Sequence, residues 1–220
     1  VDRPGWFAGQ VALVTGGSAG IGLAAARQWA EEGASVMTAA RRTDVGEAAA
    51  QSIRDAGGQA RFVPADMSDP ASIKAMVDAT IAAYGRLDIS FNNAGRTSNV
   101  AEPIHEANPE DFEDIIAVNT KGVWYACKYQ FAEMLKVGGG SIIICGSMAS
   151  IRGGTGKAAG YYTSKHAIMG LMKQVAMDGA RRNIRCNAVL PGLVMTEIVA
   201  NKFAEVKAGL EHHFANIPMG

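Results

Sequence analysis

The chain has 220 residues, of which 48% are hydrophobic and 19% are charged. This composition is typical of a folded, soluble globular protein and excludes a largely disordered chain. The 21 Lys and Arg residues balance the 21 Asp and Glu residues, so net charge provides nothing that would attract nucleic acid or an anionic membrane. No apolar run approaches the ~20 residues needed to span a bilayer.

The N-terminal stretch VDRPGWFAGQVALVTGG lacks a basic segment followed by an apolar one, so no signal peptide is predicted. Cys127, Cys145 and Cys186 lie far apart in sequence and form no CxxC pair. We therefore expect three buried thiols, without a disulfide framework, in the reducing cytoplasm. The four histidines show no metal-ligand spacing with cysteines or carboxylates, so no metal site is predicted.

Apolar runs alternate with amphipathic stretches along the chain. Strands are predicted at 10–17, 34–41, 60–69, 86–95, 140–147 and 184–192. Helices are predicted at 21–33, 45–58, 70–85, about 109–135 and about 160–180. The buried strands are nearly continuous apolar runs, as expected of parallel strands covered on both faces. This succession predicts an α/β fold, a Rossmann-type doubly wound parallel β-sheet with helices on both faces.

A glycine-rich segment, TGGSAGIG at 15–22, follows the first predicted strand and opens the first helix. Gly16, Gly20 and Gly22 permit backbone angles and a close approach that a Cβ would block. The following helix would direct free N–H groups and its positive dipole end toward a pyrophosphate. The segment therefore predicts dinucleotide binding, with a tight turn that binds nothing as the alternative.

Two adjacent tyrosines precede a lysine in the stretch AGYYTSKHA. Residues three or four apart share one side of a helix, so either Tyr161 or Tyr162 could lie beside Lys165. Free tyrosine has a pKa near ~10, whereas a useful acid/base needs ~7. An ammonium at ~4 Å, with an effective dielectric of ~20, would supply the difference of about 4 kcal/mol. We therefore expect a tyrosine proton donor whose pKa is lowered by the lysine.

Three motifs occur in order: TGGSAGIG, NNAG at 92–95 and Tyr161-x-x-x-Lys165. Together they resemble the classical short-chain dehydrogenases/reductases, and the likeness covers nearly the whole chain. The resemblance implies one domain over 1–220 that carries both the cofactor and the substrate sites. It further implies an enzyme that interconverts a carbonyl and a secondary alcohol by hydride transfer with a nicotinamide cofactor.

The resemblance also assigns the catalytic roles. Tyr161 would be the acid/base, and Tyr162 a packing or substrate-facing residue. Lys165 would lower the pKa of Tyr161 and hydrogen-bond the cofactor ribose. Asn119, in VNTKG, would distort its helix and hold a water that connects Lys165 to solvent.

Ser147, at the end of the strand SIIICGS, matches the family serine that hydrogen-bonds the substrate oxygen. Ser150 is the alternative for this role. Hydride would pass between the nicotinamide and the carbonyl carbon while the tyrosine protonates the oxygen.

The resemblance places cofactor contacts in four segments: the glycine loop, the end of the third strand, NNAG and PGLVMT. Asp66 would touch the adenine edge, with a helix N-cap as its alternative role. The remaining implied contacts are Gly16, Ser18, Gly20, Ile21, Gly22, Met67, Asn93, Ala94, Gly95, Pro191, Gly192, Val194 and Thr196, together with Tyr161 and Lys165 of the catalytic set.

The end of the second predicted strand indicates the cofactor. A carboxylate there would accept hydrogen bonds from the ribose 2′-OH and repel a 2′-phosphate. The chain has Ala40 at this place, followed by Arg41 and Arg42. Because a guanidinium matches phosphate geometry, we predict NADP(H) over NAD(H), with Arg41 the main contact and Arg42 the second. Solvated surface arginines are the alternative.

The segment after PGLVMT is expected to be a mobile helical cover over the substrate. Its apolar residues Ile198, Phe203, Leu210 and Phe214 suggest a mostly apolar substrate face, with plain packing as the alternative. The family's last helix and strand, which follow this segment, are expected to be absent from residues 1–220. The expected assembly is a homodimer or homotetramer.

Two other functions remain open for this fold: a lyase or epimerase that uses bound nicotinamide, and a non-catalytic dinucleotide-binding regulator. The complete set of Ser147, Tyr161, Lys165 and Asn119 argues against the regulator, which has no need of an acid. The single-domain layout, without an enlarged C-terminal region, argues against the lyase or epimerase.

Overall fold

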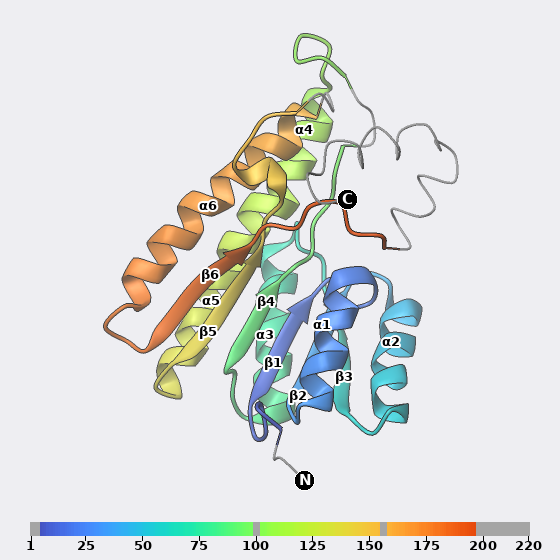
Figure 1. Cartoon of the computed structure of the whole chain (residues 1–220), viewed down its shortest axis with the longest axis vertical. Helices are drawn as coiled ribbons and strands as arrows, with labels where there is room; N and C mark the ends of the chain where they lie inside the picture. The colour runs from blue at the N-terminus through green and yellow to red at the C-terminus, as the bar shows by residue number, and fades with distance from the viewer. Residues whose placement is uncertain (1–4, 99–101, 155–157, 197–220) are drawn as a thin grey trace, which may run out of the picture.

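The computed structural model describes residues 5–98, 102–154 and 158–196 and shows a layered α/β arrangement (Figure 1). Within these residues, six parallel strands form one sheet in the order β3-β2-β1-β4-β5-β6. The strands are Val11–Thr15 (β1), Ser35–Ala40 (β2), Gln59–Pro64 (β3), Ile89–Asn92 (β4), Gly140–Cys145 (β5) and Ile184–Val189 (β6). The predicted doubly wound parallel sheet is confirmed.

Helices cover both faces of the sheet. They are Gly20–Glu31 (α1), Thr43–Asp55 (α2), Pro70–Tyr84 (α3), Pro109–Ile116 (α4), Val123–Lys136 (α5) and Ala159–Gly179 (α6), with short helical segments Ala117–Gly122 (η1) and Met148–Ser150 (η2). Buried residues of α1 and α2 pack on one face, and those of α3, α5 and α6 pack on the other. Strand β1 is buried throughout because helices cover both of its sides.

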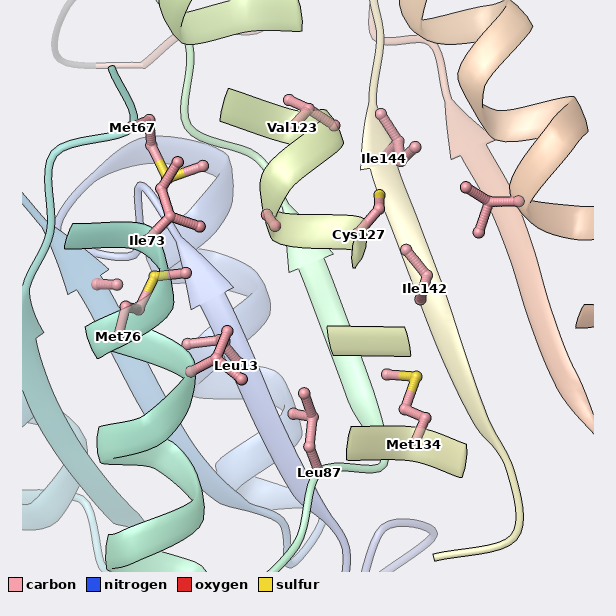
Figure 2. Packing of buried hydrophobic residues seen from close by; sticks show 14 of the residues in the cluster. Leu13, Met67, Ile73, Met76, Leu87, Val123, Cys127, Met134, Ile142 and Ile144 are labelled. Carbon is pink, nitrogen blue, oxygen red and sulfur yellow. The ribbon is translucent and has the colours of Figure 1, made fainter. Parts of the chain in front are cut away.

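Alternate residues of β1 belong to different cores. Ala12 and Val14 face the α1 and α2 side, whereas Leu13 faces the α3 and α5 side. Figure 2 shows Leu13 between Met76 of α3 and the α5 region that carries Cys127. All three cysteines are buried and free, as expected.

Helix ends follow local sequence signals. At the start of α3, the Asp69 side chain accepts a hydrogen bond of 2.9 Å from the Ala71 N–H, and Pro70 occupies the first turn. At its end, Gly85 adopts a φ of 80°. Asp66 is therefore not the N-cap of this helix, and its alternative role is excluded.

The helix predicted at about 109–135 differs from the prediction in one respect. It is continuous from Pro109 to Lys136, but residues Ala117–Gly122 form a π-helix within it. Asn119 lies in this segment and is buried. The distortion of the helix at Asn119 is thus confirmed, whereas periodicity alone had indicated a regular helix.

The fold brings the carboxyl ends of all described strands to one edge of the sheet. Strands β1 and β4 are neighbours there although two strands separate them in sequence. Such a reversal of strand order opens a crevice beyond the strand ends. In the described part of the chain, no helix is long and apolar enough to cross a membrane. The predicted substrate cover at 197–220, including Ile198, Phe203, Leu210 and Phe214, lies outside the described residues.

Candidate active site

A cleft of about 1090 Å³ opens at the carboxyl edge of the sheet. Its lining includes most of the residues that the sequence predicts for the site. These are Gly16, Ser18, Gly20, Ile21, Arg41, Arg42, Asp66, Met67, Asn93, Ala94, Gly95, Ser147, Tyr161, Lys165, Pro191, Gly192, Val194 and Thr196. Gly22 and Asn119 do not line the cleft and are buried in α1 and η1. Segments far apart in sequence thus meet at one place.

The glycine loop adopts backbone conformations that depend on its glycines. Gly16 and Gly20 have φ values of 66° and 54°, which L side chains rarely adopt. A Cβ on Gly22 would clash with the Gly16 carbonyl oxygen and lie 2.6 Å from Nδ2 of Asn93. The first turn of α1 has no side-chain cap and no acidic residue. Its N–H groups and positive dipole end can therefore receive phosphate oxygens, and the loop fits a dinucleotide.

The other end of the cleft is lined by the residues after β2 and β3. Ala40 ends β2 as predicted, and the exposed side chains of Arg41 and Arg42 line the cleft beside it. Asp66 accepts hydrogen bonds from the Ser68 N–H (2.8 Å) and the Ser68 hydroxyl (2.7 Å). These bonds, with a smaller contribution from Arg41, lower the pKa of Asp66. Asp66 is thus an ionised acceptor at neutral pH.

The NNAG segment is held to the glycine loop by Thr15, the last residue of β1. The Thr15 hydroxyl oxygen accepts hydrogen bonds from the N–H groups of Asn93 (3.0 Å) and Ala94 (3.1 Å). The Asn93 side chain donates to the carbonyl oxygens of Thr15 (3.1 Å) and Gly16 (3.3 Å). These bonds fix the loop after β4 against the loop after β1.

Ser147 follows β5 and lines the cleft. Its Oγ accepts a hydrogen bond from the Ala149 N–H (3.2 Å), and its own N–H donates to Oγ of Ser150 (3.1 Å). Ser150 is buried, and its oxygen is used in this reciprocal cap of η2. The arrangement favours Ser147 over Ser150 as the residue that can reach a substrate.

Tyr161 and Lys165 occupy successive turns of α6 and both line the cleft. Lys165 is buried, and its ammonium lies 5.7 Å from the centre of the Tyr161 ring. Its Nζ donates a 2.8 Å hydrogen bond to the carbonyl oxygen of Cys145, at the end of β5. This bond ties the helix that carries the tyrosine to the strand that precedes Ser147.

The pKa of Tyr161 differs in direction from the sequence-based expectation. Burial raises this pKa, while a hydrogen bond with the Ser147 side chain lowers it to a smaller extent. Burial also lowers the pKa of Lys165, with Cys145 acting weakly in the opposite direction. The charge argument for Lys165 omitted the desolvation of both groups, which is the largest cause of each pKa shift.

Tyr162 lies next to Tyr161 with its ring nearly perpendicular, at an interplanar angle of 89°. Its hydroxyl approaches the backbone at Gly154 so closely that a Cβ on that glycine would collide with it. Unlike Tyr161, Tyr162 does not line the cleft. This placement agrees with a packing role for Tyr162.

Asn119 joins the loop after β4 to α6. Its Oδ1 accepts from the Arg96 N–H (2.9 Å), and its Nδ2 donates to the Arg96 carbonyl oxygen (2.9 Å). The same Nδ2 donates to Oγ of Ser164 (3.0 Å), whose hydroxyl donates to the Tyr161 carbonyl oxygen (2.8 Å). The side chain of Asn119 thus links the backbone of Arg96, through Ser164, to the backbone of Tyr161.

The last lining segment follows β6. The Met148 N–H donates to the Pro191 carbonyl oxygen (3.1 Å), which links this segment to the η2 region. A Cβ on Gly20 would lie 3.1 Å from Cγ2 of Thr196. The Pro-Gly segment therefore approaches the glycine loop across the cleft.

Several polar residues at or beside the site were given no role from the sequence, among them Thr15, Arg96 and Ser164. Thr15 is the first residue of TGGSAGIG, Ser164 lies within Tyr161-x-x-x-Lys165, and Arg96 directly follows NNAG. Their positions in or next to these motifs were the available signal. Within the described residues, no group of three or more His, Cys, Asp or Glu residues is arranged to hold a metal.

Residues 10–207 match the family model described as short chain dehydrogenase. A short chain dehydrogenase/reductase, astE, of Aspergillus oryzae is 39% identical over 199 residues, which are 90% of this chain and 76% of that protein. The solved NAD⁺-bound xylitol dehydrogenase has a TM-score of 0.87 at 32% identity, covering 92% of this chain and 77% of that one.

A second solved structure, from Beutenbergia cavernae with NADP bound at low occupancy, has a TM-score of 0.88 at 35% identity. The match covers 98% of this chain and 84% of that one. The family model covers most of the sequence, and these relatives share both the fold and over 30% of their residues with it. The chain belongs to the short-chain dehydrogenase/reductase family of NAD(P)-dependent oxidoreductases, whose members act on CH–OH groups.

Proposed function

We propose that this protein is an NADP(H)-dependent oxidoreductase that interconverts a carbonyl compound and a secondary alcohol, with Tyr161 as the acid/base. The observation that supports this most directly is that Ser147, Tyr161 and Lys165 line the same cleft as the glycine loop. The proposed proton donor and the proposed dinucleotide site would thus lie on adjoining elements.

A bound nicotinamide supplies the hydride, and the protein supplies position and charge. Tyr161 protonates the carbonyl oxygen, for which the neutral phenol favoured by burial is the correct form. The Ser147 hydroxyl, in hydrogen-bond contact with the Tyr161 side chain, orients this oxygen and stabilises the charge that develops on it. Lys165 is placed to hydrogen-bond the ribose, and Asn119 supports proton resupply through water.

The proposed preference for NADP(H) rests on the end of β2. Ala40 provides no carboxylate to repel a 2′-phosphate, and the exposed guanidinium groups of Arg41 and Arg42 line the cleft next to it. Exposed arginines are free to turn toward a phosphate at little cost. Relatives hold either cofactor, since one solved structure contains NAD⁺ and another contains NADP. Arg41 is the proposed main contact, and Arg42 the second.

The remaining proposed cofactor contacts follow the cleft. The glycine loop and Asn93–Gly95 of the NNAG segment would hold the pyrophosphate side. Asp66 and Met67 would contact the adenine, and the Pro191–Thr196 segment would contact the nicotinamide amide. The positive φ values at Gly16 and Gly20 and the closed space at Gly22 support the first of these.

The test follows NADPH absorbance across a panel of ketones and aldehydes with Tyr161→Phe and a matched variant, Tyr162→Phe. Loss of the acid should lower turnover by about 10²- to 10⁴-fold, while NADPH binding, measured by fluorescence, stays close to wild type. Tyr162→Phe should keep its turnover, because this tyrosine does not line the cleft. Full turnover in Tyr161→Phe would exclude the proposed acid.

We further infer a homodimer or homotetramer located in the cytoplasm. Helix α5 exposes 47% of Trp124 and 44% of Leu135, so it has apolar side chains available for a subunit contact. Three free, buried cysteines are compatible with a reducing compartment. Light scattering on the purified full-length protein tests the assembly, and a monomeric mass would exclude it.

A further inference from the structure

Arg96, the residue directly after the NNAG motif, makes two ion pairs with α4. Its Nη2 lies 2.8 Å from Oδ1 of Asp111, and its Nη1 lies 2.6 Å from Oδ2 of Asp114. The Arg96 and Asp111 side chains are only 26% and 22% exposed, whereas that of Asp114 is 68% exposed. The pair with Asp111 is thus the better shielded from solvent.

The backbone of Arg96 is also held, by hydrogen bonds to the side chain of Asn119. Its N–H donates to Oδ1 of Asn119 and its carbonyl oxygen accepts from Nδ2, both at 2.9 Å. The second N–H of this amide group continues to Ser164, which in turn donates to the Tyr161 carbonyl oxygen. A continuous path of polar contacts therefore runs from α4 through Arg96 and Asn119 to the backbone of Tyr161.

The neighbouring glycine shows how closely this backbone packs. A Cβ added to Gly95 would lie 3.2 Å from Oδ1 of Asn119 and 3.7 Å from Nζ of Lys165. The backbone at Gly95 therefore lies against both the amide of Asn119 and the ammonium of Lys165.

We propose that Arg96 is a positioning residue. Its ion pairs with Asp111 and Asp114 clamp the loop after β4 onto α4. The clamped loop in turn keeps the side chains of Asn119, Lys165 and Tyr161 in their positions at the cleft. The proposal rests on the proposed function, because it concerns the same catalytic groups. A guanidinium suits the task, since its planar fork can reach two carboxylates at once. An ordinary surface ion pair would affect stability slightly and turnover not at all.

The test compares Arg96→Met, Asp111→Asn and their double variant with a control, Arg54→Met. Arg54 also makes a partly exposed ion pair, with Glu47, but lies in α2 and does not line the cleft. Asp111→Asn is the decisive single change, because Asp111, unlike Arg96, is not part of the cleft lining. Arg96→Lys serves as the conservative variant, which can restore one ion pair.

We expect kcat for carbonyl reduction to fall about tenfold to 100-fold in Arg96→Met, with KM for NADPH unchanged within about twofold. Asp111→Asn should also lower kcat. The kcat of the double variant should be no lower than that of Arg96→Met, because both substitutions break the same ion pair. Arg96→Lys should recover part of the loss. Arg54→Met should leave kcat unchanged.

A second readout does not depend on turnover. Hydrogen exchange of the peptides that contain Arg96 and Asn119 should quicken in Arg96→Met and remain unchanged in Arg54→Met. Wild-type kcat and exchange in both Arg96→Met and Asp111→Asn would overturn the clamp. Losses that multiply in the double variant would overturn it as well.

Tyr161→Phe, measured alongside, separates the two proposals. A Tyr161→Phe variant without turnover beside a fully active Arg96→Met variant would reject the clamp and leave the proposed function in place. A fully active Tyr161→Phe variant would reject the proposed acid, whereas the exchange result would still decide whether Arg96 clamps the loop.

Discussion

The side-chain amides of Asn92 and Gln130 exchange two hydrogen bonds, each 2.9 Å long, between β4 and α5. Both side chains are almost fully buried, with 1% and 0% of their surface exposed. Asn92 is the first residue of the NNAG motif and the last residue of β4. The pair therefore fixes α5 to the strand end from which the cleft-lining residues Asn93, Ala94 and Gly95 emerge.

Replacing Gln130 with leucine should lower the free energy of unfolding by about 1–3 kcal/mol, because the buried Asn92 amide would lose both of its hydrogen bonds to Gln130 and keep only a long contact with Sγ of Cys127. The matched control is Gln174→Leu, at an exposed position of α6 where the side chain bonds only to the nearby Asp178. Urea unfolding of both variants provides the measurement. Equal stability of Gln130→Leu and wild type would show that the amide pair contributes no net stabilisation.

Much of this fold could be predicted from the sequence, because buried parallel strands and amphipathic helices leave strong periodic signals. The π-helix at Ala117–Gly122 could not be located by periodicity, and only the family resemblance indicated a distortion at Asn119. The amide of Asn119 in this segment hydrogen-bonds the backbone of Arg96, a residue 23 positions away. Contacts of this kind leave no local pattern.

The site residues that belong to recognisable motifs could be predicted from the sequence. Parallel strands deliver their carboxyl ends to one edge, so residues after β1, β4 and β5 had to meet. Thr15, Arg96 and Ser164 were missed because a threonine in a strand, an arginine in a loop and a serine in a helix are individually ordinary. The sequence predicted a lowered pKa for Tyr161, whereas burial raises it, and the degree of burial is known only from the folded chain.

Gly22→Ala should weaken NADPH binding by at least about tenfold, an effect of about 1.4 kcal/mol. The added methyl group would clash with the Gly16 carbonyl oxygen and crowd Asn93, so the glycine loop would have to open. Gly170→Ala is the control, since its Cβ would meet nothing within 4 Å on the exposed side of α6. That variant should bind NADPH normally and gain about 0.5–1 kcal/mol of stability.

Fluorescence titration with NADPH and thermal unfolding measure the two effects of the glycine variants. Normal NADPH binding by Gly22→Ala would show that the loop tolerates a side chain. The close packing at Gly22 would then have no bearing on the dinucleotide site.

Ala40→Asp should shift the cofactor preference toward NADH by about tenfold to 100-fold, or about 1.4–2.8 kcal/mol. The new carboxylate at the end of β2 would repel a 2′-phosphate and accept hydrogen bonds from a 2′-hydroxyl. Ala48→Asp adds the same charge at an exposed position of α2 that does not line the cleft, and should leave the preference unchanged. The ratio of kcat/KM for NADPH and NADH gives the result. A wild-type protein that already prefers NADH would contradict the roles proposed for Arg41 and Arg42.

Titration of Tyr161 should show opposite effects of burial and of the oxidised cofactor. In the cofactor-free protein, burial raises its pKa above the ordinary value of 10.0. Ser147→Ala should raise this pKa further, because the hydrogen bond that it removes favours the phenolate. Saturating NADP⁺ should lower the pKa by about 1–3, since a positive ring next to the hydroxyl favours the phenolate. The rate of alcohol oxidation, which needs the phenolate, should therefore rise with pH through the lowered pKa.

The tyrosinate absorbance of wild type minus that of Tyr161→Phe isolates this titration from those of the other tyrosines. Tyr162→Phe should leave the difference signal in place, because the hydroxyl that it removes does not reach the cleft. A Tyr161 titration midpoint below 10 in the cofactor-free protein would mean that the charge of Lys165 lowers the pKa more than burial raises it. This is the result that the sequence alone predicts. If NADP⁺ left the midpoint unchanged, Tyr161 would lie too far from the nicotinamide to serve as the acid/base of hydride transfer. The roles proposed for Ser147 and Lys165 would then fail as well, because both depend on Tyr161 being the acid/base.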